Sequence, residues 1–246
     1  MDKLQLVPEA VAVITDIHAN LPALGAALEQ IDELGIRRVY CGGDLVGYGP
    51  RPNDVCALIQ ERGIPTIYGN YDYAIARDLE DCGCAYVTPH DRELGQQSVD
   101  WTLAHTDQTS KDFMRELPFD LGFDVGGVPV HLVHGSPRKV NEYLFEDKPA
   151  SLYERLARAE DARLLVFGHT HKPWVREYGG VTFVNCGSVG KPKDGDPRAA
   201  FAVLRPDGGA VHVAIERVRY DAETVADEVR EVGLPAEFAD KLLVAA

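Results

Sequence analysis

The sequence lacks long apolar runs: nowhere in its 246 residues does one approach the ~20 consecutive apolar residues of a membrane span. Residues 1–11 contain neither a basic region nor a long apolar region, so we expect no signal peptide. Internal repeats, low-complexity tracts and linkers are also missing from the sequence. These absences predict a single domain over residues 1–246 that does not associate with a membrane.

Positive charge is scarce. The chain has 25 Lys and Arg against 39 Asp and Glu, which gives a net charge of −14. Such a surface repels a polyphosphate backbone, so we expect no non-specific nucleic-acid binding. Small anionic substrates are not excluded, because bound cations can reverse the field locally.

Cysteines are few and irregularly spaced. There are five, and an odd count without a framework favours reduced thiols and a cytoplasmic location. Cys82 and Cys84 have the spacing of half a soft-metal site. No second pair lies near them, so we interpret them as incidental thiols.

Short apolar strands alternate with helices in the first part of the chain, and this alternation predicts parallel pairing. We expect strands at 9–15, 38–41 and 65–68. We also expect one helix that begins after the N-cap residue Asn20 and runs to Leu34, and a second over 52–62. Residues 74–117 have a different pattern that predicts a helical insertion or cap, with a polar helix over 96–117. Such a cap beside the site would be a source of substrate selectivity. We interpret its His90 and His105 as surface residues.

The second half predicts more strands. Gly126 and Gly127 form the turn of a hairpin within 119–133, and a helix follows at 151–160. An acidic C-terminal extension, residues 221–246, predicts one or two amphipathic helices. The remaining predicted strands are 164–167, 174–177, 181–185, 199–204 and 210–217.

Metal-type side chains follow these strands. His169 and His171 come directly after a buried strand and Gly168, and in extended backbone residues i and i+2 point the same way. Asp16 and His18 repeat this spacing after the first strand. Because ligands gather at the carboxyl ends of parallel strands, we predict one metal centre there. Its candidate ligands are Asp16, His18, Asp44, Asn70, His134, His169 and His171.

Five short blocks of the sequence resemble, in residues and in order, those of the calcineurin-like metallophosphoesterases, over about residues 11–189. The matching blocks are Asp16-x-His18, Gly43-Asp44, Gly69-Asn70-x-Asp72, His134-Gly135 and Gly168-His169-x-His171. The opening at 16–20 and the segment 185–188 are closest to the small bacterial and archaeal phosphodiesterase-like branch. The resemblance implies an α/β (α+β) fold: a four-layer αββα sandwich of two mixed β-sheets flanked by helices, with the helical insertion near a dinuclear active site.

The resemblance also implies a ligand assignment for two divalent transition metal ions. The first ion takes Asp16, His18 and His171, the second takes Asn70, His134 and His169, and Asp44 bridges them. We expect manganese first, with iron, nickel, cobalt or zinc also accepted by such a donor set. The implied reaction is hydrolysis of a small phosphorylated substrate, a phosphodiester, by in-line attack of a metal-bridging hydroxide. The implied catalytic residues are Asp16, Asp44, Asn70, His134, Tyr71 and Asp72.

Tyr71 departs from the pattern, because many relatives have a histidine there that assists the leaving group. A phenol with an ordinary pKa near ~10 is a poorer proton donor, which predicts slower turnover or a preference for stable leaving groups. Asp72 has two expected roles. Without binding metal itself, its carboxylate either fixes the tautomer of a histidine ring or caps the helix that follows.

Substrate contacts are predicted at Asn70 and Arg138. Arg138 lies four residues beyond His134, and its guanidinium suits phosphate oxygens, although a surface arginine is an equal alternative. Ser188 and the Gly187 amide are expected either to line the substrate mouth or to form a plain turn.

Two alternatives to a phosphodiesterase stay open. One is a phosphomonoesterase or phosphoprotein phosphatase, although the block at 69–72 lacks the His-Glu ending of the eukaryotic Ser/Thr phosphatases. The other is a non-catalytic scaffold like the retromer subunit with this fold, which has lost metal-site histidines that this chain retains. Relatives of this type often pair, so we also expect a homodimer.

Overall fold

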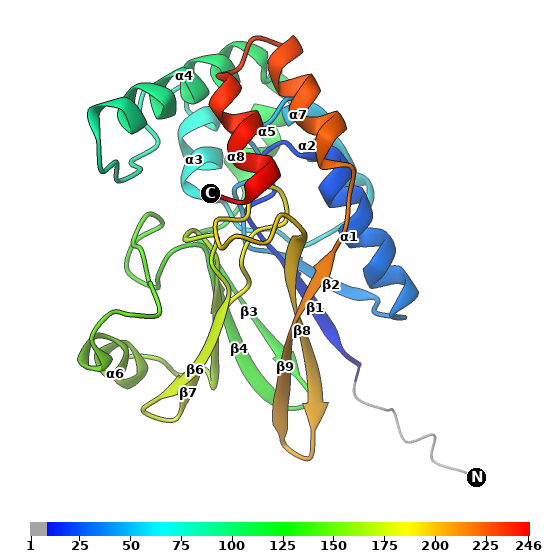
Figure 1. The fold of residues 1–246 in the computed structure, drawn as a ribbon. Coiled ribbons are helices and arrows are strands. Elements are labelled where there is room, and N and C mark those ends of the chain that lie inside the picture. Colours follow the sequence, from blue (N-terminus) through cyan, green and yellow to red (C-terminus); the bar gives the residue numbers. More distant parts are fainter. Residues whose placement is uncertain (1–8) are drawn as a thin grey trace.

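The computed structural model describes residues 9–246, so the expectation that residues 1–11 form no signal peptide falls largely outside the described residues. Within the described range, no helix is both long and apolar enough to cross a membrane. Two β-sheets pack face to face, and helices lie on their outer faces (Figure 1).

The strands form two mixed sheets. The smaller has the order β2-β1-β8-β9 and the larger the order β3-β4-β5-β7-β6. Parallel pairs join β1 to β2, β4 to β5 and β5 to β7, whereas the other pairs are antiparallel. The bounds are β1 (Val11–Ile14), β2 (Arg38–Cys41), β3 (Asp120–Val125), β4 (Val128–Val133), β5 (Leu164–Phe167), β6 (Trp174–Tyr178), β7 (Val181–Asn185), β8 (Ala199–Asp207) and β9 (Ala210–Val218).

Alternation along the strands creates the layers. In β1, Val11 and Val13 pack into the core between the sheets, whereas Ala12 and Ile14 pack against the helices. Strand β5 alternates in the same way between the inter-sheet core and a third core beneath α6 (Ala150–Arg158). The predicted four-layer αββα sandwich is therefore confirmed.

The helices of the other outer layer follow local signals in the sequence. Helix α1 begins after Asn20, as its N-cap residue predicts, and the Asn20 side chain accepts a hydrogen bond from the Ala23 amide at 3.1 Å. The bounds are α1 (Leu21–Glu33), α2 (Pro52–Glu61), α3 (Asn70–Ala76), α4 (Pro89–His105), α5 (Gln108–Glu116), α7 (Ala222–Glu231) and α8 (Ala236–Val244).

The insertion contains two helices where one was predicted over 96–117, so that prediction is wrong in extent. Helix α4 ends at His105, and Asp107 starts α5 by accepting a hydrogen bond from the Ser110 amide at 2.8 Å. Leu94 of α4 packs with Val225 of α7 and with α8. The insertion and the C-terminal extension therefore form one helical cap at the end of the sheets (Figure 1).

The predicted strand at 65–68 is also wrong: it is reduced to one bridge between Cys41 and Thr66. The Cys41 amide donates to the Pro65 carbonyl at 2.9 Å, and the Ile67 amide donates to the Cys41 carbonyl at 3.1 Å. Pairing extends no further because proline has no N–H and the Tyr68 amide donates to Pro118 instead. The segment still brings residues 69 and 70 to the end of β2.

Candidate metal centre

All the predicted metal ligands lie together and are buried. They follow β1, β2, β4 and β5, or begin α3, and none is more than 4% exposed. Two groups have donor atoms that lie within 4.8 Å of one another: Asp16, His18 and His171 in the first, and Asp44, His134 and His169 in the second.

The first group is compact. The Nε2 atom of His171 lies 3.1 Å from Nε2 of His18 and 3.2 Å from Oδ1 of Asp16, and His18 Nε2 lies 3.9 Å from the same carboxylate oxygen. A cation bound ~2.0–2.2 Å from each atom fits such spacings. The group contains the same residues that the family resemblance implies for the first ion.

The second group includes Asn70. Its Nδ2 donates to the Cys82 carbonyl at 3.1 Å and to the Cys84 sulfur at 3.2 Å, which leaves Oδ1 facing His134 Nε2 at 3.2 Å. Among the described residues, Nε2 of His169 is buried and has no hydrogen-bond partner. Such an atom costs about 1–3 kcal/mol unless something binds it. The orphaned nitrogen of His169 and the Asn70 oxygen beside His134 fit a second cation.

Asp44, a member of the second group, also faces the first. Its Oδ2 is 3.6 Å from His18 Nε2 and 3.4 Å from His134 Nε2, while its Oδ1 accepts a hydrogen bond from the Tyr71 amide at 2.9 Å. One carboxylate therefore faces both groups, and the Tyr71 amide holds it in place. This is the position that a bridging ligand requires.

Backbone carbonyls orient three of the histidines. Nδ1 of His18 donates to Val46 at 3.0 Å, Nδ1 of His134 to Gly42 at 2.8 Å, and Nδ1 of His171 to Lys191 at 2.5 Å. With the proton on Nδ1, each Nε2 lone pair is left for a metal.

The electrostatics favour cations at this site. Burial lowers the pKa of His18 to about 3 and holds the pKa values of His169 and His171 well below their usual range, so these rings are neutral, as ligation requires. Burial also acts to lower the pKa of His134, but Asp44, Asp16 and the Gly42 carbonyl more than offset it and raise the value to about 10. The two carboxylates, Asp16 and Asp44, thus favour positive charge at the His134 ring and in the space next to it.

The backbone at the ligands is strained. Asp16, His18, Asp44, His169 and His171 all have φ between 49° and 64°, a left-handed region that costs about 1–2 kcal/mol for a residue with a Cβ. The reason given above for the His169–His171 pair, two side chains on the same face of extended backbone, is therefore wrong. The turned backbone sends the two rings to different groups.

Two glycines allow the carboxylates to approach. A Cβ on Gly168 would lie 2.1 Å from Oδ2 of Asp16, and a Cβ on Gly69 would lie 2.0 Å from Oδ1 of Asp44. A side chain at either position would displace a ligand.

Asp72 supports the loops that carry the candidate ligands. Its carboxylate accepts hydrogen bonds from the amides of Leu45 at 2.8 Å, Val46 at 3.3 Å and Gly69 at 2.9 Å. These bonds cap α3 and hold the loop that carries Asp44, as the cap alternative predicts. Its partners are thus backbone amides and not a histidine ring, so it positions the ligand loops.

Two predicted functional residues are engaged elsewhere. Tyr71 is fully buried, its hydroxyl donates to Ser98 at 3.3 Å, and burial raises its pKa well above the usual value. Arg138 has a half-exposed side chain that pairs with Glu142. The catalytic role of Tyr71 and the phosphate contact of Arg138 stay predictions.

The turn at 187–188 is structural. Ser188 is fully buried and donates to the Asp16 carbonyl at 2.7 Å, and the Gly187 amide donates to Asn185 Oδ1 at 2.9 Å. The plain-turn alternative is therefore confirmed, and these groups do not line a substrate mouth.

The sequence reasoning missed several residues next to the centre. The ring of Tyr143 lies 4.0 Å from that of His169, and the ring of Tyr48 lies 5.0 Å from that of His18. Lys191, whose carbonyl orients His171, follows the end of β7 at the same sheet edge, and that position was a signal for it. Cys82 and Cys84 are free thiols, as interpreted, but they also orient Asn70.

Comparisons with known proteins agree with this geometry. Residues 10–209 match the calcineurin-like phosphoesterase superfamily domain. A metallophosphoesterase from Sphaerobacter thermophilus is similar in structure, with a TM-score of 0.78, 29% identity and coverage of 97% of this chain and 100% of that one. A hypothetical protein from Pyrococcus horikoshii gives a TM-score of 0.84 at 27% identity, with 96% of this chain and 98% of that chain covered.

A curated relative adds an activity. Phosphodiesterase YfcE of Escherichia coli is 27% identical over 193 residues, which cover 78% of this chain and 85% of the relative. The matched domain spans the strands and loops that carry every candidate ligand, and those ligands form groups of metal-binding type. The chain therefore belongs to the calcineurin-like phosphoesterase superfamily and is a phosphoric ester hydrolase.

Proposed function

We propose that this chain is a dinuclear metal-dependent phosphodiesterase. The observation that carries the proposal is the position of Asp44, whose Oδ2 lies 3.6 Å from a nitrogen of the first ligand group and 3.4 Å from one of the second. The curated relative named a phosphodiesterase supports the choice of a diester over a monoester.

When bound, two divalent ions supply positive charge to a phosphoryl group and lower the pKa of a water molecule. The chain's own residues prepare that site. Asp16 and Asp44 offset part of the metal charge. The neutral rings of His18, His169 and His171, the Asn70 oxygen, and His134 once it gives up its proton to bind a cation complete the donor set without cancelling that charge.

The reaction is a displacement at phosphorus. A water molecule loses one proton as its oxygen forms a bond to phosphorus. The bond between phosphorus and one ester oxygen breaks, and the leaving alkoxide takes up one proton, so that protons balance. Burial of the ligands keeps bulk water away and strengthens their electrostatic effect on the developing charge. A scaffold role would not require seven ligand-type side chains to be held together at this cost.

The proposal includes a metal and a location. We expect manganese first, although imidazole, carboxylate and amide oxygen donors without a thiolate also accept iron, nickel, cobalt or zinc. Five free cysteines support a cytoplasmic location, where thiols stay reduced.

Hydrolysis assays test the proposal. Chelator-stripped protein is reloaded with Mn, Ni or Zn and assayed on bis-p-nitrophenyl phosphate and p-nitrophenyl phosphate. We expect metal-restored cleavage of the diester that is lost in His169→Ala and kept in His212→Ala, an exposed histidine on β9. Faster monoester cleavage would replace the diesterase with a phosphatase, and silence toward both esters by metal-loaded protein would refute the activity.

A further inference from the structure

A cavity of about 280 Å³ opens beside the metal centre. The ring of its lining residue Tyr143 packs against that of His169 with a centroid distance of 4.0 Å, and Cys84 accepts a hydrogen bond from Asn70 at 3.2 Å. Lys191 also lines it and holds His171 through its carbonyl. Three lining residues thus contact three different candidate ligands, so the metal centre borders this cavity.

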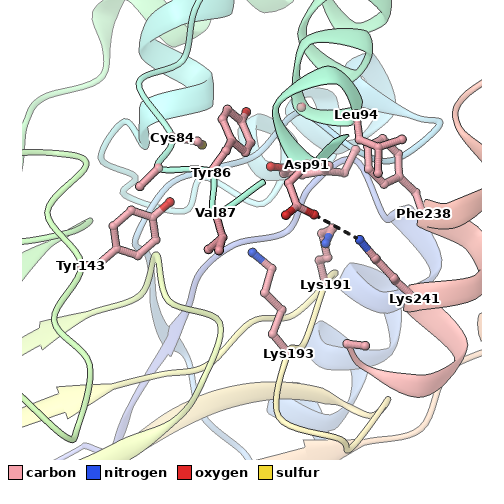
Figure 2. Close-up of a pocket in the computed structure, with 14 residues that line it drawn as sticks. Cys84, Tyr86, Val87, Asp91, Leu94, Tyr143, Lys191, Lys193, Phe238 and Lys241 are labelled. Carbon is pink, nitrogen blue, oxygen red and sulfur yellow. Dashed lines mark ion pairs between the residues drawn. The ribbon is translucent and has the colours of Figure 1, made fainter. Parts of the chain in front are cut away.

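Three lysines face the cavity. Lys191, Lys193 and Lys241 send their ammonium groups toward the same hollow, as Figure 2 shows. Lys241 lies 3.9 Å from Asp91, but within residues 9–246 no ion pair joins Lys191 or Lys193 to a carboxylate. Lys191 is only 9% exposed, and its ammonium lies 4.7 Å from the centre of the Tyr48 ring.

The buried ammonium of Lys191 needs a partner, whereas the side chains of Lys193 and Lys241 are partly exposed. A buried charge without a counter-ion is costly, and this clustering occurs in a chain whose net charge is −14. Among the described lining residues, Asp91 carries the one acidic side chain and Ala246 contributes its terminal carboxylate, so the three lysines still outnumber the acidic groups. An anion in the cavity would offset the remaining positive charge.

The walls limit the size and kind of that anion. The rings of Tyr86, Tyr143 and Phe238 line the cavity, and α4 and α8 close it from the cap side. Its volume is at the lower end of the ~300–1,000 Å³ of small-molecule sites. It suits a molecule of mononucleotide size and excludes a folded phosphoprotein or a long strand.

We propose that this lysine cavity binds a second phosphate group of a small phosphodiester, with an aromatic base against Tyr86 and Tyr143, while the scissile phosphate lies at the metal centre. Lys193 and Lys241 contact the second phosphate. This substrate class, a nucleotide diester with an additional phosphate, rests on the proposed phosphodiesterase function.

The kinetic test uses a matched pair of substrates: thymidine 5′-(p-nitrophenyl phosphate) with and without a 3′-phosphate. We expect kcat/KM to be about tenfold or more higher with the 3′-phosphate, as a charge-assisted hydrogen bond predicts. Lys193→Met and Lys241→Met should each reduce this preference, whereas Lys148→Met, which removes a lysine outside the lysine cavity, should leave it unchanged.

A binding test is independent of hydrolysis. Calorimetric titration of chelator-treated protein with thymidine 3′,5′-bisphosphate should show binding that weakens about tenfold in Lys193→Met but not in Lys148→Met. Lysine-dependent binding by a protein that hydrolyses nothing would refute the diesterase and leave the anion site standing. Hydrolysis with equal kcat/KM for the two esters, or binding that is unchanged in Lys193→Met, would overturn the lysine cavity.

Discussion

Metal binding should stabilise this protein strongly. Asp16 and Asp44 are buried, and no lysine or arginine among residues 9–246 forms an ion pair with either. Within residues 9–246, Nε2 of His169 is buried without a hydrogen-bond partner, and five of the seven candidate ligands have left-handed backbone. Each of these features opposes folding, and a bound cation compensates for each of them.

The expected magnitude follows from linkage. A ligand at 100 times its Kd stabilises the folded state by about 2.7 kcal/mol per site, so two sites give about 5 kcal/mol. For a chain of this size each kcal/mol raises Tm by about 2–4 °C. Saturation with Mn should therefore raise Tm by about 10–20 °C relative to chelator-treated protein.

Differential scanning fluorimetry over a Mn titration measures this shift. His169→Ala removes a ligand of the second group only, so we expect its metal-dependent shift to fall to about half that of the wild type. His212→Ala, on the exposed face of β9, should show the full shift. A wild-type Tm that does not respond to metal, or an equal response in His169→Ala, would refute the reasoning.

Further predictions concern single substitutions. Gly168→Ala puts a Cβ 2.1 Å from Asp16 Oδ2 and should lower metal content by at least about one ion per chain in elemental analysis. Gly122→Ala, where nothing lies within 4 Å of the added Cβ, should leave the metal content unchanged. Equal losses in the two variants would contradict the steric argument. Tyr71→His should raise activity mainly on esters with poor leaving groups, and an equal change for good and poor ones would defeat this prediction. Arg138→Ala should raise KM for bis-p-nitrophenyl phosphate about tenfold; Arg176→Ala, an exposed and paired control, should not, and equal KM values for the two variants would remove Arg138 from the site.

The sequence predicted the local structure well because local structure depends on neighbouring residues. The cap at Asn20, the Gly126-Gly127 hairpin and the buried first strand each depend on only a few residues, and each is confirmed. The extent of the 96–117 helix was wrong because Asp107 offers a cap that competes with continuation of the helix. The 65–68 strand was wrong because its pairing is ended by a distant contact with Pro118.

The sequence by itself also predicted which side chains gather as candidate metal ligands, because donor chemistry is a property of side-chain type and of position at a strand end. It did not determine, from spacing alone, which donors share an ion. His169 and His171 are two residues apart yet join different groups, because left-handed backbone and carbonyl contacts from residues far along the chain orient each ring.

Only the tertiary structure decided the surroundings of the centre. Asp44 faces both ligand groups because the loop after β2 is held by Asp72. Lys193 and Lys241 come from different segments, and only the packing of the helical cap onto the sheet ends brings them to one cavity. Contacts between residues so distant in sequence are set by the whole core, so no local pattern in the chain reveals them.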